Sequence, residues 1–277
     1  MRILACQIQI PAIDNREKQL KHIDTVINKL EAQLIGKRVD LVVLPELSTI
    51  EYSAENFKNI DLFSEDLYGE TFDKFSQFCR RNNVAICYGM PRKEDGDAYI
   101  SQVTLGRNGE YLTHYDKIHT AEYGDAAELK YFKRGNHLSV FEVDGVRAGI
   151  IICYDMRFPE LIRRLCGEFC VDVILHPVAF AQDLSFHTWK QFVISRALEN
   201  QVYFMSINQS GDHFGQSIIC PPWVDDTVQP LIFGQEEEFR LVEVDREVIT
   251  KVRHEIPYRR DTLADYDVLP VRSSENK

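Results

Sequence analysis

The chain has 277 residues, and its 43 Asp and Glu residues outnumber its 32 Lys and Arg residues, which gives a formal net charge of −11 at pH 7. This charge disfavours a phosphate-backbone partner, so we expect no binding to nucleic acid. The apolar stretch at the N-terminus is too short for a signal peptide and no window approaches about 18 apolar residues, so we expect a soluble, cytoplasmic protein that does not enter membranes.

The seven cysteines form an odd set without the paired spacing of a disulfide scaffold, and we expect them to be reduced. A chain of 277 residues can form one large domain or two small ones. No linker-like, highly charged or low-complexity stretch interrupts this chain. We therefore predict a single domain.

Strand-like and helix-like stretches alternate in the first third of the chain. The spacing of Asp14 and Glu17 resembles a capping box that opens an amphipathic helix reaching about residue 34. The other predicted elements of this part are a strand at 2–10, a strand at 39–44, a helix at 68–81 and a strand at 84–88.

Two hairpins follow, at the turns Asn108-Gly109 and Asp144-Gly145, which join strands 100–105 with 110–116 and 138–143 with 146–152. The remaining predicted elements are a helix at 158–169, a strand at 171–175, a helix at 185–200, strands at 202–207, 216–220 and 239–244, and a helix at 246–254. Apolar strands interleaved with amphipathic helices, together with antiparallel hairpins, predict a layered α/β sandwich.

A thiol stands at the end of the most apolar strand-like run, 149–153, which closes with Cys153. Glu46 follows another apolar run, and Lys117 follows the strand at 110–116. In one desolvated pocket, Glu46 would accept the proton of the thiol, while Lys117 and the backbone N–H of Tyr154 would stabilise a carbonyl oxygen that becomes negative. This set predicts attack on an amide-like carbon, a thioester intermediate and hydrolysis by water.

Other interpretations of these residues remain open at this point. Cys153 could be a thiol of the core, Glu46 a turn cap and Lys117 a solvated charge. The thiol could also pair with a histidine as in a cysteine protease, and nothing in their spacing selects among the candidates His119, His137, His176 and His187.

Three segments in this order, 44–46, 116–119 and 152–160, are similar to the signature segments of the nitrilase superfamily, also called carbon–nitrogen hydrolases. The similarity extends from about residue 2 to about residue 266. It implies Glu46 as general base, Lys117 as oxyanion-stabilising cation and Cys153 as nucleophile. It also implies a four-layer α-β-β-α sandwich, one carbon–nitrogen hydrolase domain over 1–277 with a short tail from about 257, a homodimer or larger homo-oligomer, and no metal or organic cofactor.

The resemblance also implies a second catalytic glutamate, between the lysine and the cysteine, that helps to position substrate or water; Glu128 fits this place and Glu122 is a nearby rival. Arg157 could bind a substrate carboxylate in a bidentate manner, or instead form an ion pair with Asp155 or Glu160. The expected substrate-binding residues are Tyr154, Arg157, Tyr52 and Phe180, with Tyr123 and Trp189 as further aromatic walls.

The segment after Cys153 resembles most closely the Nit subgroup, which includes ω-amidases. We therefore expect an amidase that uses water to hydrolyse a small carboxylate-bearing amide and releases ammonia. Hydrolysis of N-carbamoyl amino acids, aliphatic amides or nitriles is an alternative within the same superfamily. A catalytically silent binding protein on the same fold is an alternative from another class.

Overall fold

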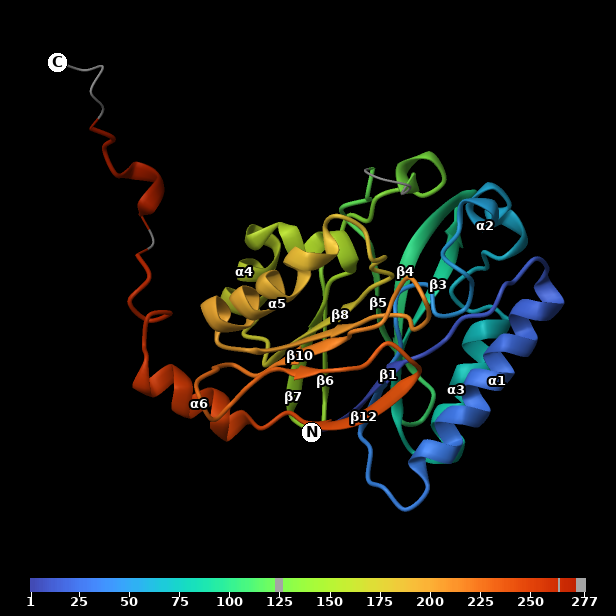
Figure 1. The fold of residues 1–277 in the computed structure, drawn as a ribbon, viewed down its shortest axis with the longest axis horizontal. Helices are drawn as coiled ribbons and strands as arrows, with labels where there is room; N and C mark the ends of the chain where they lie inside the picture. Colours follow the sequence, from blue (N-terminus) through green and yellow to red (C-terminus); the bar gives the residue numbers. More distant parts are fainter. Residues whose placement is uncertain (123–126, 264, 273–277) are drawn as a thin grey trace.

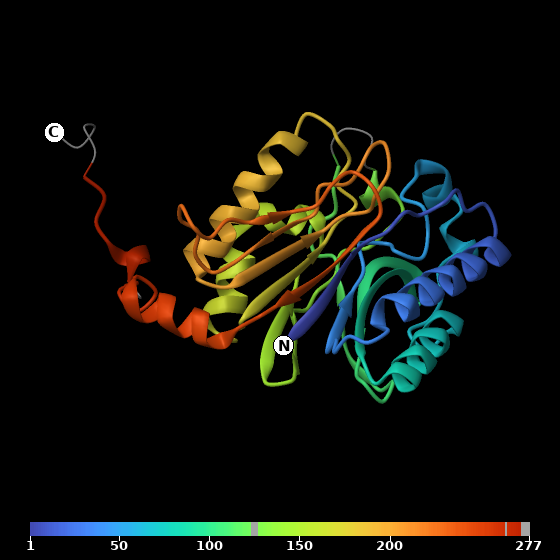
Figure 2. The same cartoon turned by 60° about the horizontal axis from the view of Figure 1, so that its bottom comes forward.

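The computed structural model describes residues 1–122, 127–263 and 265–272. Two six-stranded sheets pack face to face, with helices on both outer sides (Figure 1). Figure 2 shows the same layers after a rotation, with α1 and α3 outside one sheet and α4 and α5 outside the other. The predicted four-layer α-β-β-α sandwich is confirmed.

The first sheet has the strand order β12-β1-β2-β3-β4-β5, in which β1, β2 and β3 are parallel and the other neighbours are antiparallel. Its strands are β1 (Arg2–Gln7), β2 (Leu41–Val43), β3 (Ala85–Glu94), β4 (Asp97–Leu105), β5 (Tyr111–Asp116) and β12 (Glu238–Glu243).

The second sheet has the order β11-β10-β9-β8-β7-β6, in which β7, β8 and β9 are parallel. Its strands are β6 (Ser139–Val143), β7 (Val146–Ile150), β8 (Val173–Pro177), β9 (Tyr203–Ile207), β10 (Ile218–Cys220) and β11 (Leu231–Ile232). Each sheet therefore contains a central parallel set whose carboxyl ends lie at one edge.

The α-helices are α1 (Arg16–Leu34), α2 (Ala54–Lys58), α3 (Glu70–Asn82), α4 (Pro159–Gly167), α5 (Phe186–Asn200) and α6 (Arg246–Glu255). Short 3₁₀ turns are η1 (Ile60–Leu62), η2 (Glu128–Lys130), η3 (Cys153–Arg157) and η4 (Tyr266–Val268). Within the described ranges, no helix has the length and apolar character needed to cross a bilayer.

Alternation of side chains explains why the central strands are apolar on both faces. In β2, Leu41 and Val43 belong to the core cluster between the sheets, whereas Val42 belongs to the cluster under α1 and α3. A strand covered on both faces needs a continuous apolar run rather than an alternating one. The parallel strands are thus fixed in place by two cores.

The structure corrects several predicted boundaries. The cap of α1 is Asn15, whose side chain accepts a hydrogen bond from the Lys18 backbone N–H, and not Asp14. The predicted helix at 158–169 is α4, which runs from Pro159 to Gly167; the turn η3 before it is a separate element, because the Phe158 backbone between them is extended. The hairpin between β3 and β4 was not predicted. Its turn residues Asp95 and Gly96 both have positive φ in the structure.

The turn that carries Glu46 is braced by β3. The Leu47 backbone has a φ of 47°, and a Cβ at Gly89 would lie 2.5 Å from the Leu47 nitrogen and 2.5 Å from the Pro45 oxygen. Ser48 Oγ accepts a hydrogen bond from the Gly89 N–H at 3.0 Å and donates one to its carbonyl at 3.1 Å. Only glycine, which has no Cβ, allows β3 to come this close to the turn, so Gly89 fixes the distance between β3 and the turn that carries Glu46.

A buried ion pair fixes the end of β5. Arg92 Nη2 and Nε lie 2.7 and 3.1 Å from the two carboxylate oxygens of Asp116, and both side chains are 4% exposed. Burial opposes the ionised form of Asp116, but hydrogen bonds from His114, Arg92 and Ser101 and the charge of Arg92 hold its pKa well below the usual range. Because Lys117 is the next residue, this pair supports the end of the strand that delivers it.

We predict that Arg92→Met lowers the free energy of unfolding by about 3–5 kcal/mol, because it leaves the Asp116 carboxylate buried without its cation. Arg81→Met is the matched control, since Arg81 and its partner Glu31 are 54% and 35% exposed and such a pair contributes about 1 kcal/mol or less. Urea denaturation at neutral pH measures both. Equal losses of unfolding free energy in the two variants would contradict the claim that the buried pair stabilises the protein more than the exposed one.

Candidate active site

Cys153 lies on a turn at the edge of the second sheet. β7 ends at Ile150, and Cys153 begins η3. Its φ is 43°, in the left-handed region, and the residue is 8% exposed. This conformation costs free energy for any residue except glycine and persists only where neighbouring groups hold it. The thiol therefore stands on a strained turn that the surrounding structure supports.

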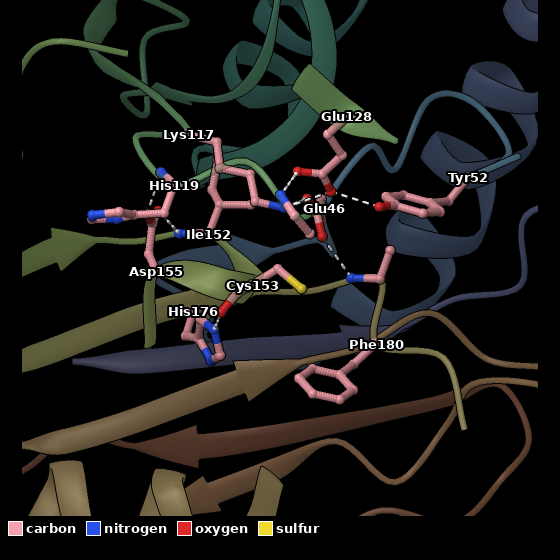
Figure 3. Close-up of polar contacts among 12 residues, drawn as sticks. Glu46, Tyr52, Lys117, His119, Glu128, Ile152, Cys153, Asp155, His176 and Phe180 are labelled. Atoms are coloured by element: carbon pink, nitrogen blue, oxygen red, sulfur yellow. Dashed lines mark hydrogen bonds and ion pairs between the residues drawn. The ribbon is translucent and has the colours of Figure 1, made fainter. Parts of the chain in front are cut away.

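Lys117 joins two carboxylates in a buried cluster (Figure 3). Its Nζ lies 2.8 Å from Glu46 Oε1 and 2.8 Å from Glu128 Oε1, and the three side chains are at most 1% exposed. Glu46 follows β2, Lys117 follows β5 and Glu128 begins η2. Figure 3 shows the Cys153 sulfur on the same side of its turn as the Glu46 carboxylate. The structure thus brings together the four residues that the sequence analysis named as catalytic.

Glu46 is held from the second sheet as well as the first. The backbone N–H of Ala179, just after β8, donates a hydrogen bond to Glu46 Oε2 at 2.8 Å. The Gln209 side chain, just after β9, donates to the Glu46 backbone carbonyl at 3.1 Å. Both ends of this residue are therefore fixed, and the direction of its carboxylate is fixed with them.

The charges within the cluster shift one another's proton affinity. Burial raises the pKa of Glu46, the ammonium of Lys117 opposes that rise and the charge of Glu128 adds to it, so that the pKa remains above its ordinary value. Burial alone would lower the pKa of Lys117, but Glu128 and Glu46 outweigh it and raise that pKa well above the usual range. Lys117 is therefore a permanent cation beside a carboxylate that is a stronger base than usual.

The sulfur of Cys153 is a thiol in the resting protein. Burial raises its pKa well above the usual range and the charge of Glu46 raises it further, while Lys117 and the Ala179 backbone N–H act in the opposite direction. A thiol must lose its proton to attack a carbonyl carbon. The arrangement is suited to removal of that proton during attack, by a base already in the pocket.

Glu128 and Glu122 occupy different environments. Glu128 is fully buried, and its carboxylate accepts hydrogen bonds from Tyr52 Oη at 2.5 Å and from the Ala121 N–H at 2.7 Å. Glu122 is exposed and accepts a hydrogen bond from the Leu129 backbone. The hydroxyl of Tyr52, expected to contact substrate, is instead directed at Glu128, and only its ring remains available as a wall.

Arg157 extends from η3 towards α5. Its guanidinium carbon lies 6.0 Å from the ring centre of Phe180 and 5.0 Å from that of Phe192. Its Nη2 is buried and has no hydrogen-bond partner among the described residues. Buried guanidinium nitrogens are rarely left unpaired, so this atom is available to an acceptor that enters the site.

The other expected wall residues are partly in place. Phe180 is buried and stacks on Trp189 with ring centres 5.4 Å apart and planes 5° apart. Tyr154 is half-buried, and its ring meets Phe158 edge to face at 5.3 Å. Tyr123 lies outside the described residues.

The sequence analysis did not predict that Asp155 connects the separate segments of the site. Its Oδ2 accepts hydrogen bonds from the Ile152 N–H at 3.0 Å and from Tyr115 Oη at 2.8 Å. Its Oδ1 accepts from the His119 backbone N–H at 2.9 Å and contacts His119 Nδ1 at 2.7 Å. Its place two residues after the thiol was the available signal. Asp155 ties the Cys153 turn to the segment that follows Lys117.

The histidines considered as partners of the thiol have other contacts. His119 is bound to Asp155, and His137 Nε2 lies 3.0 Å from the His114 carbonyl oxygen. His176 Nε2 contacts the backbone oxygen of Cys153 at 2.9 Å rather than its sulfur. His187 lies on α5 beside a surface pocket. Within the described ranges, the base that faces the thiol is therefore Glu46.

His114, Asp116 and His137 place potential metal-ligand atoms within 4.8 Å of one another. Both carboxylate oxygens of Asp116 are engaged by Arg92, and His114 Nδ1 contacts Tyr111 Oη at 2.7 Å. A cation here would have to displace a buried guanidinium. The chemistry of this donor set fits an ion-pair network better than a metal site.

Comparison with known proteins matches residues 2–254 to the carbon–nitrogen hydrolase family. The chain is 26% identical to omega-amidase NIT2 of Xenopus tropicalis, over 90% of this chain and 91% of that protein. It is 28% identical to 2-oxoglutaramate amidase of Bacillus subtilis, over 83% and 87%. The crystal structure of Nit3 from Saccharomyces cerevisiae superposes with a TM-score of 0.81 at 21% identity and covers 97% of both chains, which shows the shared fold.

The family model covers nearly the whole chain, and several of the similar proteins carry the name omega-amidase NIT2. The resemblance found in the sequence is thereby confirmed, and the protein is a hydrolase of carbon–nitrogen bonds other than peptide bonds. This chain belongs to the carbon–nitrogen hydrolase family.

Proposed function

We propose that the protein hydrolyses the amide group of a small carboxylate-bearing amide and releases ammonia, with Cys153 as nucleophile, Glu46 as general base and Lys117 as the cation that stabilises the oxyanion. One observation carries this proposal. A thiol on a supported left-handed turn faces a buried carboxylate with a raised pKa, and a lysine cation lies 2.8 Å from that carboxylate.

In the first half-reaction, Glu46 takes the proton of the thiol as the sulfur forms a bond to the amide carbon. Glu46 and Glu128 use two of the three hydrogens of the Lys117 ammonium, so the third can be donated to the developing oxyanion. The Tyr154 backbone N–H is proposed as a second donor. The carbon–nitrogen bond breaks, the departing nitrogen takes the proton from Glu46, and ammonia leaves a thioester on Cys153.

In the second half-reaction, Glu46 takes a proton from a water molecule, whose oxygen attacks the thioester carbon. The carbon–sulfur bond breaks, the acid product is released and the proton returns to the sulfur. Glu128 holds Lys117 and Tyr52 in place through both steps. No further reactant is required.

Arg157 supports the assignment of a carboxylate-bearing substrate. Its unpaired buried nitrogen, close to the rings of Phe180 and Phe192, suits a charge-assisted hydrogen bond to a carboxylate. The alternative ion pair with Asp155 is disfavoured, because both oxygens of Asp155 already accept hydrogen bonds. Two similar proteins carry the names omega-amidase and 2-oxoglutaramate amidase, and the second name specifies an amide that bears a carboxylate.

We also propose that the protein is a cytoplasmic homodimer, formed from one domain over 1–277 with a tail from about 257. The described residues of this tail, 257–263 and 265–272, lead away from the body (Figure 1) and expose apolar side chains. Among them, Leu263, Tyr266 and Val271 are 53%, 56% and 85% exposed. A second copy would cover this surface, and sedimentation of the purified chain tests the assembly.

The seven unpaired cysteines fit a reducing compartment, which supports the cytoplasmic location.

Replacement of the nucleophile tests the mechanism. We predict that Cys153→Ala lowers kcat for ammonia release from succinamate on the order of 10⁴-fold or more, without loss of folded protein. Cys170→Ser is the matched control, because Cys170 is an exposed thiol away from the cluster. Turnover that survives Cys153→Ala would reject the mechanism, as would equal losses in the two variants.

The acid limb of the pH profile reports on Glu46. The base must be ionised to act and its pKa is raised, so kcat/KM should fall with decreasing pH at a midpoint above about 4.3, the ordinary glutamate value. Glu128→Gln removes a negative charge that raises this pKa, so we predict lower activity with the acid limb moved to lower pH. An acid limb that stays in place would contradict the coupling.

Arg157 tests the substrate class. We predict that Arg157→Leu lowers kcat/KM for succinamate and α-ketoglutaramate by about 10- to 150-fold, as expected for a lost charge-assisted hydrogen bond, and leaves butyramide nearly unaffected. Arg157→Lys should restore only part of the loss. Arg163→Leu, on the exposed face of α4, controls for the change in charge. Turnover of carbamoyl amino acids, aliphatic amides or nitriles alone would assign the other superfamily chemistry, and an inert panel would favour a silent binding protein.

A further inference from the structure

The left-handed turn at Cys153 requires support on both sides of the nucleophile. On the N-terminal side, Asp155 accepts a hydrogen bond from the Ile152 N–H. On the C-terminal side, the Cys153 carbonyl oxygen lies 2.9 Å from Nε2 of His176, a residue of β8 with 0% exposure. A strained φ is held by such contacts, so loss of either one allows the turn to relax.

His176 connects the Cys153 backbone to a buried chain of hydrogen bonds. Its Nδ1 lies 2.8 Å from Ser206 Oγ, and Ser206 Oγ lies 2.8 Å from Trp189 Nε1. Trp189, His176 and Ser206 are each 0% exposed. The chain therefore runs from α5 through β9 and β8 to the backbone of the nucleophile, without contact with solvent.

The donors and acceptors fix the direction of every bond in this chain. An indole N–H can only donate, so Ser206 Oγ accepts from Trp189. The Cys153 carbonyl oxygen can only accept, so the hydrogen of the neutral His176 ring lies on Nε2 and is donated to it. Nδ1 is then the unprotonated nitrogen, and it accepts the hydroxyl hydrogen of Ser206.

We propose that His176, held in one tautomer by Ser206 and Trp189, is a positioning residue that keeps the Cys153 turn in the conformation from which the thiol attacks. This inference rests on the proposed function of Cys153. It assigns His176 no proton transfer, because neither ring nitrogen is directed at the sulfur or at substrate.

The environment keeps His176 neutral across the working range of pH. Burial lowers its pKa to about 4, so the ring takes up a second proton only in acid. Above that pH the tautomer set by Ser206 persists, and the hydrogen bond to Cys153 does not switch. The same Trp189 stacks on Phe180 at 5.4 Å, so one residue supports both the nucleophile turn and a wall of the site.

Four variants, all made in a Cys170→Ser background, test this role. His176→Leu removes the donor, and His176→Gln retains an N–H at the position of Nε2. Ser206→Ala removes the hydrogen that selects the tautomer. Ser76→Ala is the matched control, because Ser76 is 2% exposed and its hydroxyl donates to the Gly109 carbonyl at 2.7 Å, under the other sheet.

We expect His176→Leu to lower kcat on the order of 100-fold with KM nearly unchanged, which is the cost of a nucleophile displaced by about 1 Å. His176→Gln should restore kcat to within about tenfold of the parent. Ser206→Ala should fall between them, and Ser76→Ala should leave kcat unchanged. The rate of alkylation of Cys153 by iodoacetamide, mapped by peptide mass spectrometry, should follow the same order.

Stability and activity are measured together so that the outcomes remain distinct. The inference is overturned if His176→Leu keeps its kcat, or if Ser206→Ala behaves like Ser76→Ala. If His176→Leu does not fold, Ser206→Ala and His176→Gln decide the matter. Loss of turnover in Cys153→Ala together with normal turnover in these variants rejects the positioning role alone, whereas turnover in Cys153→Ala rejects the proposed function.

Discussion

The site depends on one buried ammonium held between two carboxylates. Removing the charges of Lys117, Glu46 and Glu128 from water is costly, and it is tolerated only because each has partners in good geometry. Two carboxylates against one lysine leave the pocket with excess negative charge. Burial is the main reason that the thiol stays protonated at rest and that Glu46 is a stronger base, while the charge of Glu128 adds to both effects and Lys117 opposes them. The buried cluster therefore orders the pocket and prepares its chemistry.

The fold supplies this cluster by bringing strand ends from two sheets to one edge. Glu46 leaves the first sheet on a turn that Gly89 fits closely, yet its side chain and backbone are bound by Ala179 and Gln209 of the second sheet. The thiol comes from the second sheet and the lysine from the first. The geometry of the site is thus a property of the packing between the sheets, which explains why its members are far apart in sequence.

The sequence predicts the part of this site that strand ends and motif spacing encode. Glu46, Lys117 and Cys153 each follow an apolar run, and a carboxylate, an ammonium and a thiol at such positions indicate chemistry. Contacts between side chains and backbone that is distant in sequence leave no periodic pattern, so the contacts of Asp155 with His119 and of His176 with Cys153 were missed. The helix cap was displaced by one residue, because neighbouring polar residues offer equivalent local hydrogen bonds. The turn at Asp95 and Gly96 carries the same Asp-Gly signal as Asp144-Gly145 and was overlooked. The layers were predictable, since apolar periodicity determines burial.

The most direct test is to identify the covalent intermediate. Protein quenched in acid during turnover of succinamate, then digested and analysed by peptide mass spectrometry, should carry an acyl group on the peptide that contains Cys153. That group should be labile to hydroxylamine, as a thioester is, and should disappear when the substrate is exhausted. An acyl group on a different side chain that forms and decays at the rate of turnover would contradict the account.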